Sequence, residues 1–89
     1  MEIKVPHNKS QEDAKKALDA VAKEISMDIT WINDTHSIGT VSVGGFKVSG
    51  NLEVRPTEVV VNFKLPRMAR MFAGRVETGV ADKLKEALR

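Results

Sequence analysis

Residues 46–55 and 58–65 are two neighbouring segments in which apolar and polar side chains alternate. The apolar positions are Phe46, Val48, Leu52, Val54, Val59, Val61, Phe63 and Leu65. This alternation is typical of antiparallel strands that have one face against a core and the other in water. We predict that Val48, Leu52, Val61 and Phe63 point toward the core, and that Lys47, Asn51, Glu53 and Asn62 point away from it. Gly50 stands on the apolar face, where glycine indicates a bulge or the close packing of a helix.

A sheet with one apolar face needs a cover, and two segments with helical periodicity supply it. The first follows Ser10, which has Asp13 three residues later in the spacing of a capping box. Its apolar residues recur in steps of three and four: Ala14, Ala17, Leu18, Val21, Ala22 and Ile25. The second follows Pro66, with apolar residues every four positions: Met68, Phe72, Val76, Val80, Leu84 and Leu88. On the first helix we also expect i,i+4 pairs of Glu12 with Lys16 and of Asp19 with Lys23.

Three weaker strands complete the predicted order. They are residues 2–6, ended by Pro6, residues 28–33, and residues 37–43. Asn33-Asp34-Thr35 and Gly44-Gly45 have the composition of tight turns. We predict one α+β domain over residues 1–89, with the order β-α-β-β-β-β-α and both helices on one face of a mainly antiparallel sheet. The pattern does not place the first strand within that sheet.

No pattern of catalytic residues or metal ligands is present. The chain has no cysteine, and its only histidines, His7 and His36, lack the spacing of a metal site, so we expect both at the surface. No phosphate-binding glycine loop or nucleophile elbow occurs. We therefore predict that the chain is not an enzyme and that it binds neither a cofactor nor a metal ion. For Trp31, packing against the core beside Ile29 is favoured over contact with a ligand or partner.

The ends and the hydropathy of the chain predict a cytoplasmic protein. The first residues lack the basic and apolar regions of a secretory signal. The longest apolar run is Val59-Val60-Val61, far too short to span a membrane. The absence of cysteine fits a reducing compartment.

The C-terminal helix carries the strongest candidate interaction surface. Six basic and three acidic residues lie between Arg67 and Arg89, whereas the net charge of the whole chain is only +2. Arg67, Met71 and Arg75, with Arg70 at the edge, project away from the predicted core stripe and are candidates for partner binding. One Met contributes only about 1.5–3 kcal/mol when buried, so we expect docking onto a protein with an acidic patch rather than coating of an apolar surface. The other interpretation is an ordinary solvated helix face.

Several segments together resemble the small proteins encoded in polyhydroxyalkanoic acid biosynthesis and granule gene regions. They are residues 7–14 (HNKSQEDA), Trp31 with Asp34, residues 48–54 (VSGNLEV) and residues 72–77 (FAGRVE). The last two are similar to the family patterns V-S-G-x-L-x-V and F-x-G-[KR]-[IV]-E. The segments occur in order over nearly the whole chain, whereas residues 35–45 depart from the pattern and are longer than usual.

The resemblance implies a bacterial protein associated with storage-polyester metabolism, at the granule surface, and it implies no catalytic residue. The leading hypothesis is a non-enzymatic accessory protein that binds another granule-associated or polymerase-associated protein. The alternative is a small domain that binds an apolar ligand between sheet and helices. A third hypothesis is nucleic-acid binding by the C-terminal helix. The small net charge of the chain disfavours this hypothesis. We also expect a homodimer: if no other strand covers residues 58–65, their free strand edge invites pairing, and Val60 on the outer face adds apolar area.

Overall fold

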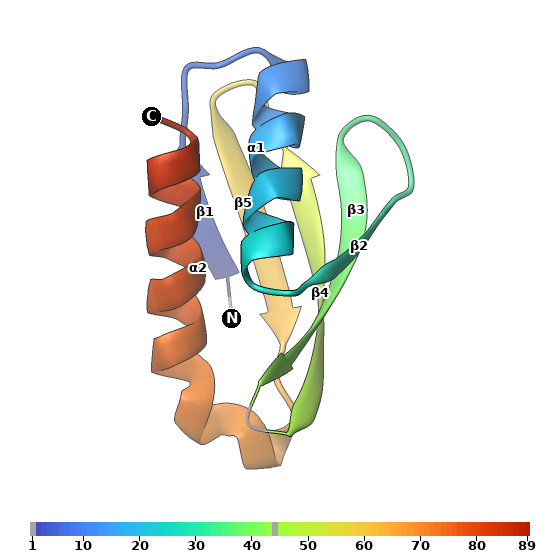
Figure 1. Cartoon of the computed structure of the whole chain (residues 1–89), viewed down its shortest axis with the longest axis vertical. Helices are drawn as coiled ribbons and strands as arrows, with labels where there is room; N and C mark the ends of the chain where they lie inside the picture. The colour runs from blue at the N-terminus through green and yellow to red at the C-terminus, as the bar shows by residue number, and fades with distance from the viewer. Residues whose placement is uncertain (1, 44) are drawn as a thin grey trace.

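The computed structural model describes residues 2–43 and 45–89, and in it both helices cover one face of a five-stranded antiparallel sheet (Figure 1). The elements are β1 (Glu2–Pro6), α1 (Gln11–Glu24), β2 (Asp28–Trp31), β3 (His36–Val43), β4 (Phe46–Val54), β5 (Glu58–Lys64), the 3₁₀ helix η1 (Arg67–Phe72) and α2 (Ala73–Ala87). The predicted α+β class and the order β-α-β-β-β-β-α are confirmed. The 3₁₀ helix before α2 was not predicted.

The strand order is β1-β5-β4-β3-β2, and this places the first strand at the edge, beside β5. β1 runs antiparallel to β5 and pairs with it from Glu58 to Asn62. The expectation of an uncovered edge along β5 is therefore wrong. Val60 is only 6% exposed and is paired with Lys4 on one side and Glu53 on the other, so it adds no apolar surface. Both reasons for expecting a homodimer through this strand are thereby removed.

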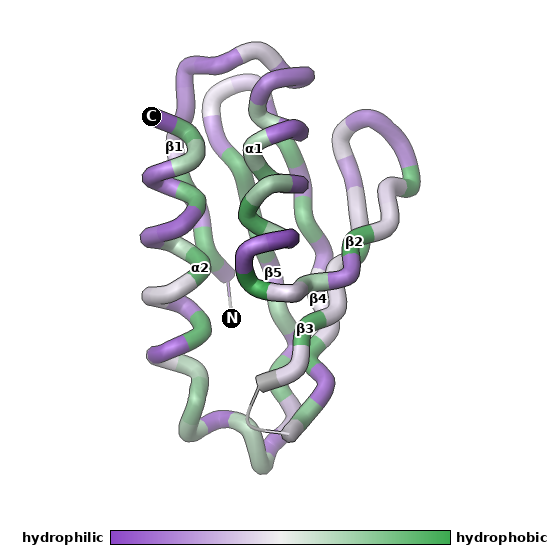
Figure 2. The backbone as a smooth tube through the Cα atoms, in the orientation of Figure 1, coloured by the Kyte–Doolittle hydropathy of each residue, from purple (hydrophilic) through white to green (hydrophobic). Residues whose placement is uncertain are grey.

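The core lies between the sheet and the two helices, as the alternation predicts. Val48, Leu52, Val61 and Phe63 are each at most 1% exposed. The four residues predicted to point outward are exposed or, for Glu53, partly exposed. The helices contribute Ala14, Leu18, Val21, Ala22, Val76, Val80, Leu84 and Leu88 to this core. Figure 2 shows apolar positions recurring along both helices and along the strands behind them.

Local hydrogen bonds confirm the predicted cap and turns. The Ser10 hydroxyl accepts a hydrogen bond from the backbone N–H of Asp13 at 3.1 Å, and this begins α1. Asn33 Oδ1 accepts hydrogen bonds from the backbone N–H groups of Thr35 and His36, both at 2.9 Å. Gly45 has a φ of 85°, which the β3–β4 turn requires, while Gly44 lies outside the described residues.

Gly50 is neither part of a bulge nor packed against a helix. It pairs with Phe63 across β4 and β5. A Cβ atom at this position would lie 2.6 Å from Phe63 Cδ1 and 2.8 Å from the Asn62 carbonyl oxygen. The missing side chain thus makes room for the aromatic ring of Phe63 on the core face of the sheet.

We expect Ser37→Ala to stabilise the fold. Ser37 is 1% exposed, and its hydroxyl has no hydrogen-bond partner among the described residues. A buried polar group without a partner costs about 1–3 kcal/mol, so its removal is expected to raise the free energy of unfolding by about 1 kcal/mol. Urea unfolding of both proteins measures the difference. A clear loss of stability would show that the hydroxyl has a partner in solution.

Candidate interaction surface

The 3₁₀ winding of η1 decides which of its side chains face outward. Three residues make one turn, so side chains three positions apart lie on the same side. Ala69 is fully buried and Phe72 is partly buried, on the side facing the protein. Met68 and Met71 are 73% and 80% exposed, on an outward side. Arg67 and Arg70 form the third side and are also exposed.

The prediction that Met68 belongs to the core stripe is therefore wrong. An α-helix would place Met68 on the same face as Phe72, four positions later. In η1 the Ala69 N–H instead donates to the Pro66 carbonyl oxygen at 2.9 Å, the i→i+3 bond of a 3₁₀ turn. From Ala73 onward the α-helical spacing holds, and Val76, Val80 and Leu84 are buried as predicted. As a result, the outward surface has two methionines rather than one.

The structure brings three of the four predicted partner-binding residues together on η1, namely Arg67, Arg70 and Met71. Arg70 lines a surface hollow together with the end of β5, including Lys64. The fourth residue, Arg75, is in the first turn of α2 and lines a different hollow with Val41 and Ser42 of β3. The arginines consequently flank the methionine pair and do not form one cluster.

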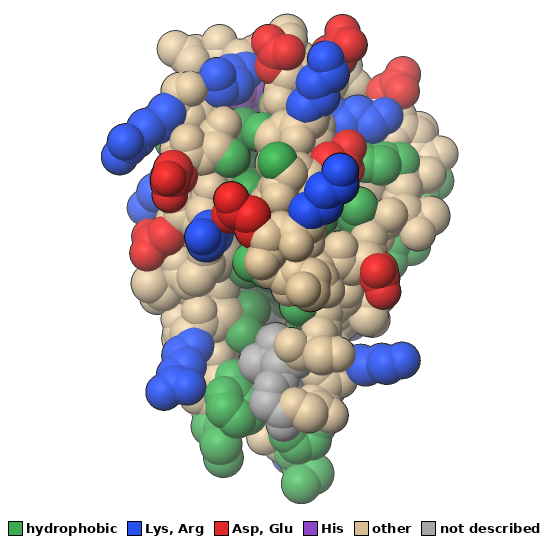
Figure 3. Space-filling view, viewed as in Figure 1, with side chains coloured by type: hydrophobic (Ala, Val, Ile, Leu, Met, Phe, Trp, Pro, Cys, Tyr) green, Lys and Arg blue, Asp and Glu red, His purple; other side chains and the backbone are tan. Residues whose placement is uncertain are grey.

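Two stretches of the chain that meet at one end of the molecule contain basic residues and no acidic residue. No Asp or Glu occurs in residues 35–52 or 59–76, which contain the β3–β4 turn, the end of β5 and η1. Their basic side chains are Lys47, Lys64, Arg67, Arg70 and Arg75, and in the part of the chain that the structure describes none of them is in an ion pair. We call these five cations, with Met68 and Met71, the apolar–basic end. Figure 3 shows it as the narrow lower end of the molecule, where hydrophobic side chains lie between basic ones.

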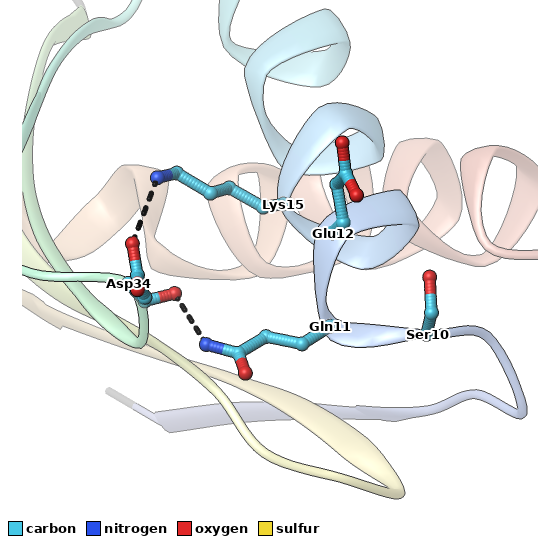
Figure 4. A pocket seen from close by; sticks show the side chains of 5 residues that line it. All are labelled: Ser10, Gln11, Glu12, Lys15 and Asp34. Atoms are coloured by element: carbon cyan, nitrogen blue, oxygen red, sulfur yellow. Dashed lines mark hydrogen bonds and ion pairs between the residues drawn. The ribbon is translucent and has the colours of Figure 1, made fainter.

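A second polar group, at the N-terminal end of α1, has a structural role. Asp34 accepts a hydrogen bond from Gln11 Nε2 through its carbonyl oxygen at 2.9 Å, and its carboxylate lies 3.8 Å from Lys15 Nζ (Figure 4). These contacts connect α1 to the β2–β3 turn. Ser10 and Glu12 line the same hollow but do not contact Asp34. Lys15 is partly exposed and the other four residues are exposed.

Trp31 packs at the rim of the core, as favoured from the sequence. Its ring is partly buried against the core residues, and its Nε1 donates a hydrogen bond to Asp19 Oδ1 at 2.8 Å. Lys15 Nζ lies 4.7 Å from the ring centroid, in a cation–π contact. Asp19 thus pairs with Trp31 instead of Lys23, whereas the predicted pair of Glu12 with Lys16 forms at 3.6 Å.

The expectation of two surface histidines holds for His36 and is wrong for His7. His7 is 9% exposed, because its ring bridges β1 and the β4–β5 turn. Nε2 donates to the Arg55 carbonyl oxygen at 2.8 Å, and Nδ1 accepts from the Lys9 N–H at 3.1 Å. Beside it, the hydrogen bond to Glu58 and then the charge of Glu53 raise the pKa of Arg55 above its ordinary value. In the described residues no three potential metal ligands come together.

The hollows on the described part of the molecule do not support the alternative hypothesis of a binding pocket for an apolar ligand. The hollow where α1 ends, between α2 and β3, has a volume of about 220 Å³ and is lined mainly by aliphatic side chains such as Val76 and Val80. Binding pockets for small molecules usually measure ~300–1,000 Å³. Larger hollows open elsewhere on the surface, but polar residues contribute to their lining, as at Ser10 and Asp34. Within the described residues, none of the helices has the length and hydropathy to cross a membrane.

Comparison with known proteins agrees with the resemblance seen in the sequence. The sequence model of a family described as "Putative polyhydroxyalkanoic acid system protein" matches residues 1–88. No curated protein matches the chain. The family match includes every strand and helix of the fold, and also the whole apolar–basic end. The chain therefore belongs to the polyhydroxyalkanoic acid system protein family.

Proposed function

We propose that this chain is a non-enzymatic accessory protein of a bacterial polyhydroxyalkanoate system. It binds a negatively charged component of the storage granule through the apolar–basic end. The observation that carries this proposal is the coincidence of two highly exposed methionines with five cations that have no ion pair among the described residues. The component is a granule-associated or polymerase-associated partner, which places the protein at the granule surface in the cytoplasm.

The two methionines change the energetic argument made from the sequence. Burial of one such side chain contributes about 1.5–3 kcal/mol, so Met68 and Met71 together contribute about 3–6 kcal/mol. Arginine adds directional hydrogen bonds to anionic groups because its guanidinium is planar and always charged. Methionine is flexible and adapts to irregular apolar surfaces. The apolar–basic end therefore has enough contact energy for a specific but reversible attachment.

The remainder of the surface offers less to a partner. The ion pairs of the structure lie at the other parts of the molecule, for example Lys15 with Asp34, Arg55 with Glu58, and Lys83 with Glu24. There, cations and anions neutralise each other locally. The outward face of the sheet carries polar side chains such as Asn51 and Asn62, and Ile38 beside Asn51 is 43% exposed. Ile38 is less exposed than either Met68 or Met71, and the sheet face has no such pair of highly exposed apolar side chains among its described residues.

The test is capture of granules purified from polymer-accumulating cells. The triple variant Arg67→Glu, Met71→Glu, Arg75→Glu is expected to bind at least tenfold less than the wild type, because each change places an anion where the partner is anionic. The matched control is Ala20→Glu, Lys23→Glu, Lys85→Glu, which changes the net charge equally at exposed positions of α1 and α2. Circular dichroism verifies that both variants fold. If the folded triple variant binds granules as well as the control does, the apolar–basic end is not the binding surface.

A further inference from the structure

The position of the apolar–basic end in the molecule indicates which kind of partner it can contact. The molecule measures 37 × 23 × 19 Å, and the end with η1 and the β3–β4 turn lies at one extreme of its longest axis (Figure 1). Two highly exposed methionines on η1, at this extreme of the long axis, suit insertion into a soft surface.

The arrangement of side chains points the same way. Met68 and Met71 lie one above the other on the outward side of η1, because residues three apart eclipse in a 3₁₀ helix. Cations lie on both flanks, with Arg70 beside the end of β5 and Arg75 on the side of β3. Exposed apolar side chains next to basic residues are typical of segments that rest in the interface of an anionic lipid layer.

We propose that the occupant of the apolar–basic end is an anionic lipid surface. Met68 and Met71 enter the boundary between headgroups and acyl chains, while Lys47, Lys64, Arg67, Arg70 and Arg75 contact lipid phosphates. Each of these cations is free to move toward a phosphate, because no carboxylate of the described residues holds it. This inference rests on the proposed function, since it names the granule component that this end binds.

The position of the end also allows such contact without unfolding. The inward side of η1, Ala69 and Phe72, stays packed against the protein when the outward side is buried. The core stripe of α2, including Val80 and Leu84, is likewise not needed for the contact. The protein can therefore contact a lipid surface through this end alone. Its long axis then points away from the lipid surface, and the sheet and α1 stay accessible.

The experiment is sedimentation with vesicles of phosphatidylcholine alone and of phosphatidylcholine with about a third phosphatidylglycerol. The wild type is expected to bind the anionic vesicles at least tenfold more tightly, and this preference should decrease at high salt because ions screen the headgroup charge. Met68→Ser with Met71→Ser, and separately Arg67→Gln with Arg70→Gln, are each expected to reduce binding at least tenfold. The matched control, Lys23→Gln with Lys85→Gln, removes two exposed charges elsewhere and should bind like the wild type.

Binding to the anionic vesicles that does not distinguish these variants from the control would overturn the inference, as would no binding at all. Capture of granules treated with a protease then separates this failure from that of the proposed function. A lipid surface survives the protease, and binding through the apolar–basic end should persist. If vesicles fail and the protease abolishes capture, the partner is an acidic protein, so the lipid inference is wrong while the proposed function stands. If the intact granules also bind the triple variant normally, the proposed function itself is wrong.

Discussion

Replacement of Phe63 by alanine is expected to lower the free energy of unfolding by about 3–5 kcal/mol, the range for a buried aromatic residue. Phe63 is 1% exposed and is among the largest fully buried side chains of the described residues. Its ring lies against Gly50, which has no side chain to move into the space that the ring leaves. The cavity cannot collapse from that side, and this places the expected loss in the upper part of the range.

Urea unfolding followed by circular dichroism measures this loss. The matched control is Asn62→Ala, one position earlier in β5 and on the outward face, where surface substitutions usually change stability by no more than about 0.5 kcal/mol. A loss below about 1 kcal/mol for Phe63→Ala would place the ring outside the core. Such a result would contradict the register of β4 and β5, since a shift by one residue exchanges the two faces of a strand.

The part of the fold that local periodicity controls was predictable. Val61 and Phe63 alternate with outward residues, and the steps of three and four from Ala14 onward define one helix face. The position of β1 was not predictable, because its five residues contain no signal for the partner with which they pair. Its pairing with β5 joins residues that are more than fifty positions apart. The same holds for His7, whose ring is fixed by a carbonyl group 48 residues away.

The error at Met68 has a different origin. The spacing of Met68 to Phe72 fits α-helical periodicity, so the sequence gives no warning that the first turns are wound more tightly. The structure reveals the 3₁₀ winding through the bonds from the Ala69 N–H to the Pro66 carbonyl oxygen and from the Ala73 N–H to the Arg70 carbonyl oxygen, and with it the outward position of Met68. A second methionine on the surface then changes the energetic argument, in which a single methionine had disfavoured the coating of an apolar surface.

The candidate surface was predictable in part. Arg67, Arg70, Met71 and Arg75 are all exposed, as the sequence indicated, but Lys47 and Lys64 were missed. They reach the same end of the molecule through the β3–β4 turn and the end of β5 (Figure 1). The signal that could have revealed them is the absence of acidic residues in two separate stretches, 35–52 and 59–76. Two acid-free stretches indicate one basic region only when the topology brings them together.

Gly50→Ala is expected to destabilise the protein by about 1–3 kcal/mol, the usual cost of forcing an extra carbon into a packed core. The new Cβ would lie 2.6 Å from the ring of Phe63 and 2.8 Å from the Asn62 carbonyl oxygen. Glycine in a strand is itself unfavourable, so a substitution without obstruction would stabilise the chain. Gly79→Ala is the matched control, because its Cβ would meet nothing within 4 Å and it lies inside α2. We expect that control to gain about 0.5–1 kcal/mol.

The effects of Phe63→Ala and Gly50→Ala on stability are expected to be coupled. A double-mutant cycle tests whether the ring of Phe63 is what requires glycine at position 50. In the Phe63→Ala background the nearest obstacle to a Cβ at position 50 is gone, and the new methyl group fills part of the cavity. The cost of Gly50→Ala should therefore decrease by about 1–2 kcal/mol, within the range of coupling for residues in contact. The Asn62 carbonyl oxygen remains 2.8 Å away, so some of the cost should persist. An equal cost in both backgrounds would show that this backbone oxygen alone, and not the aromatic ring, requires glycine at position 50.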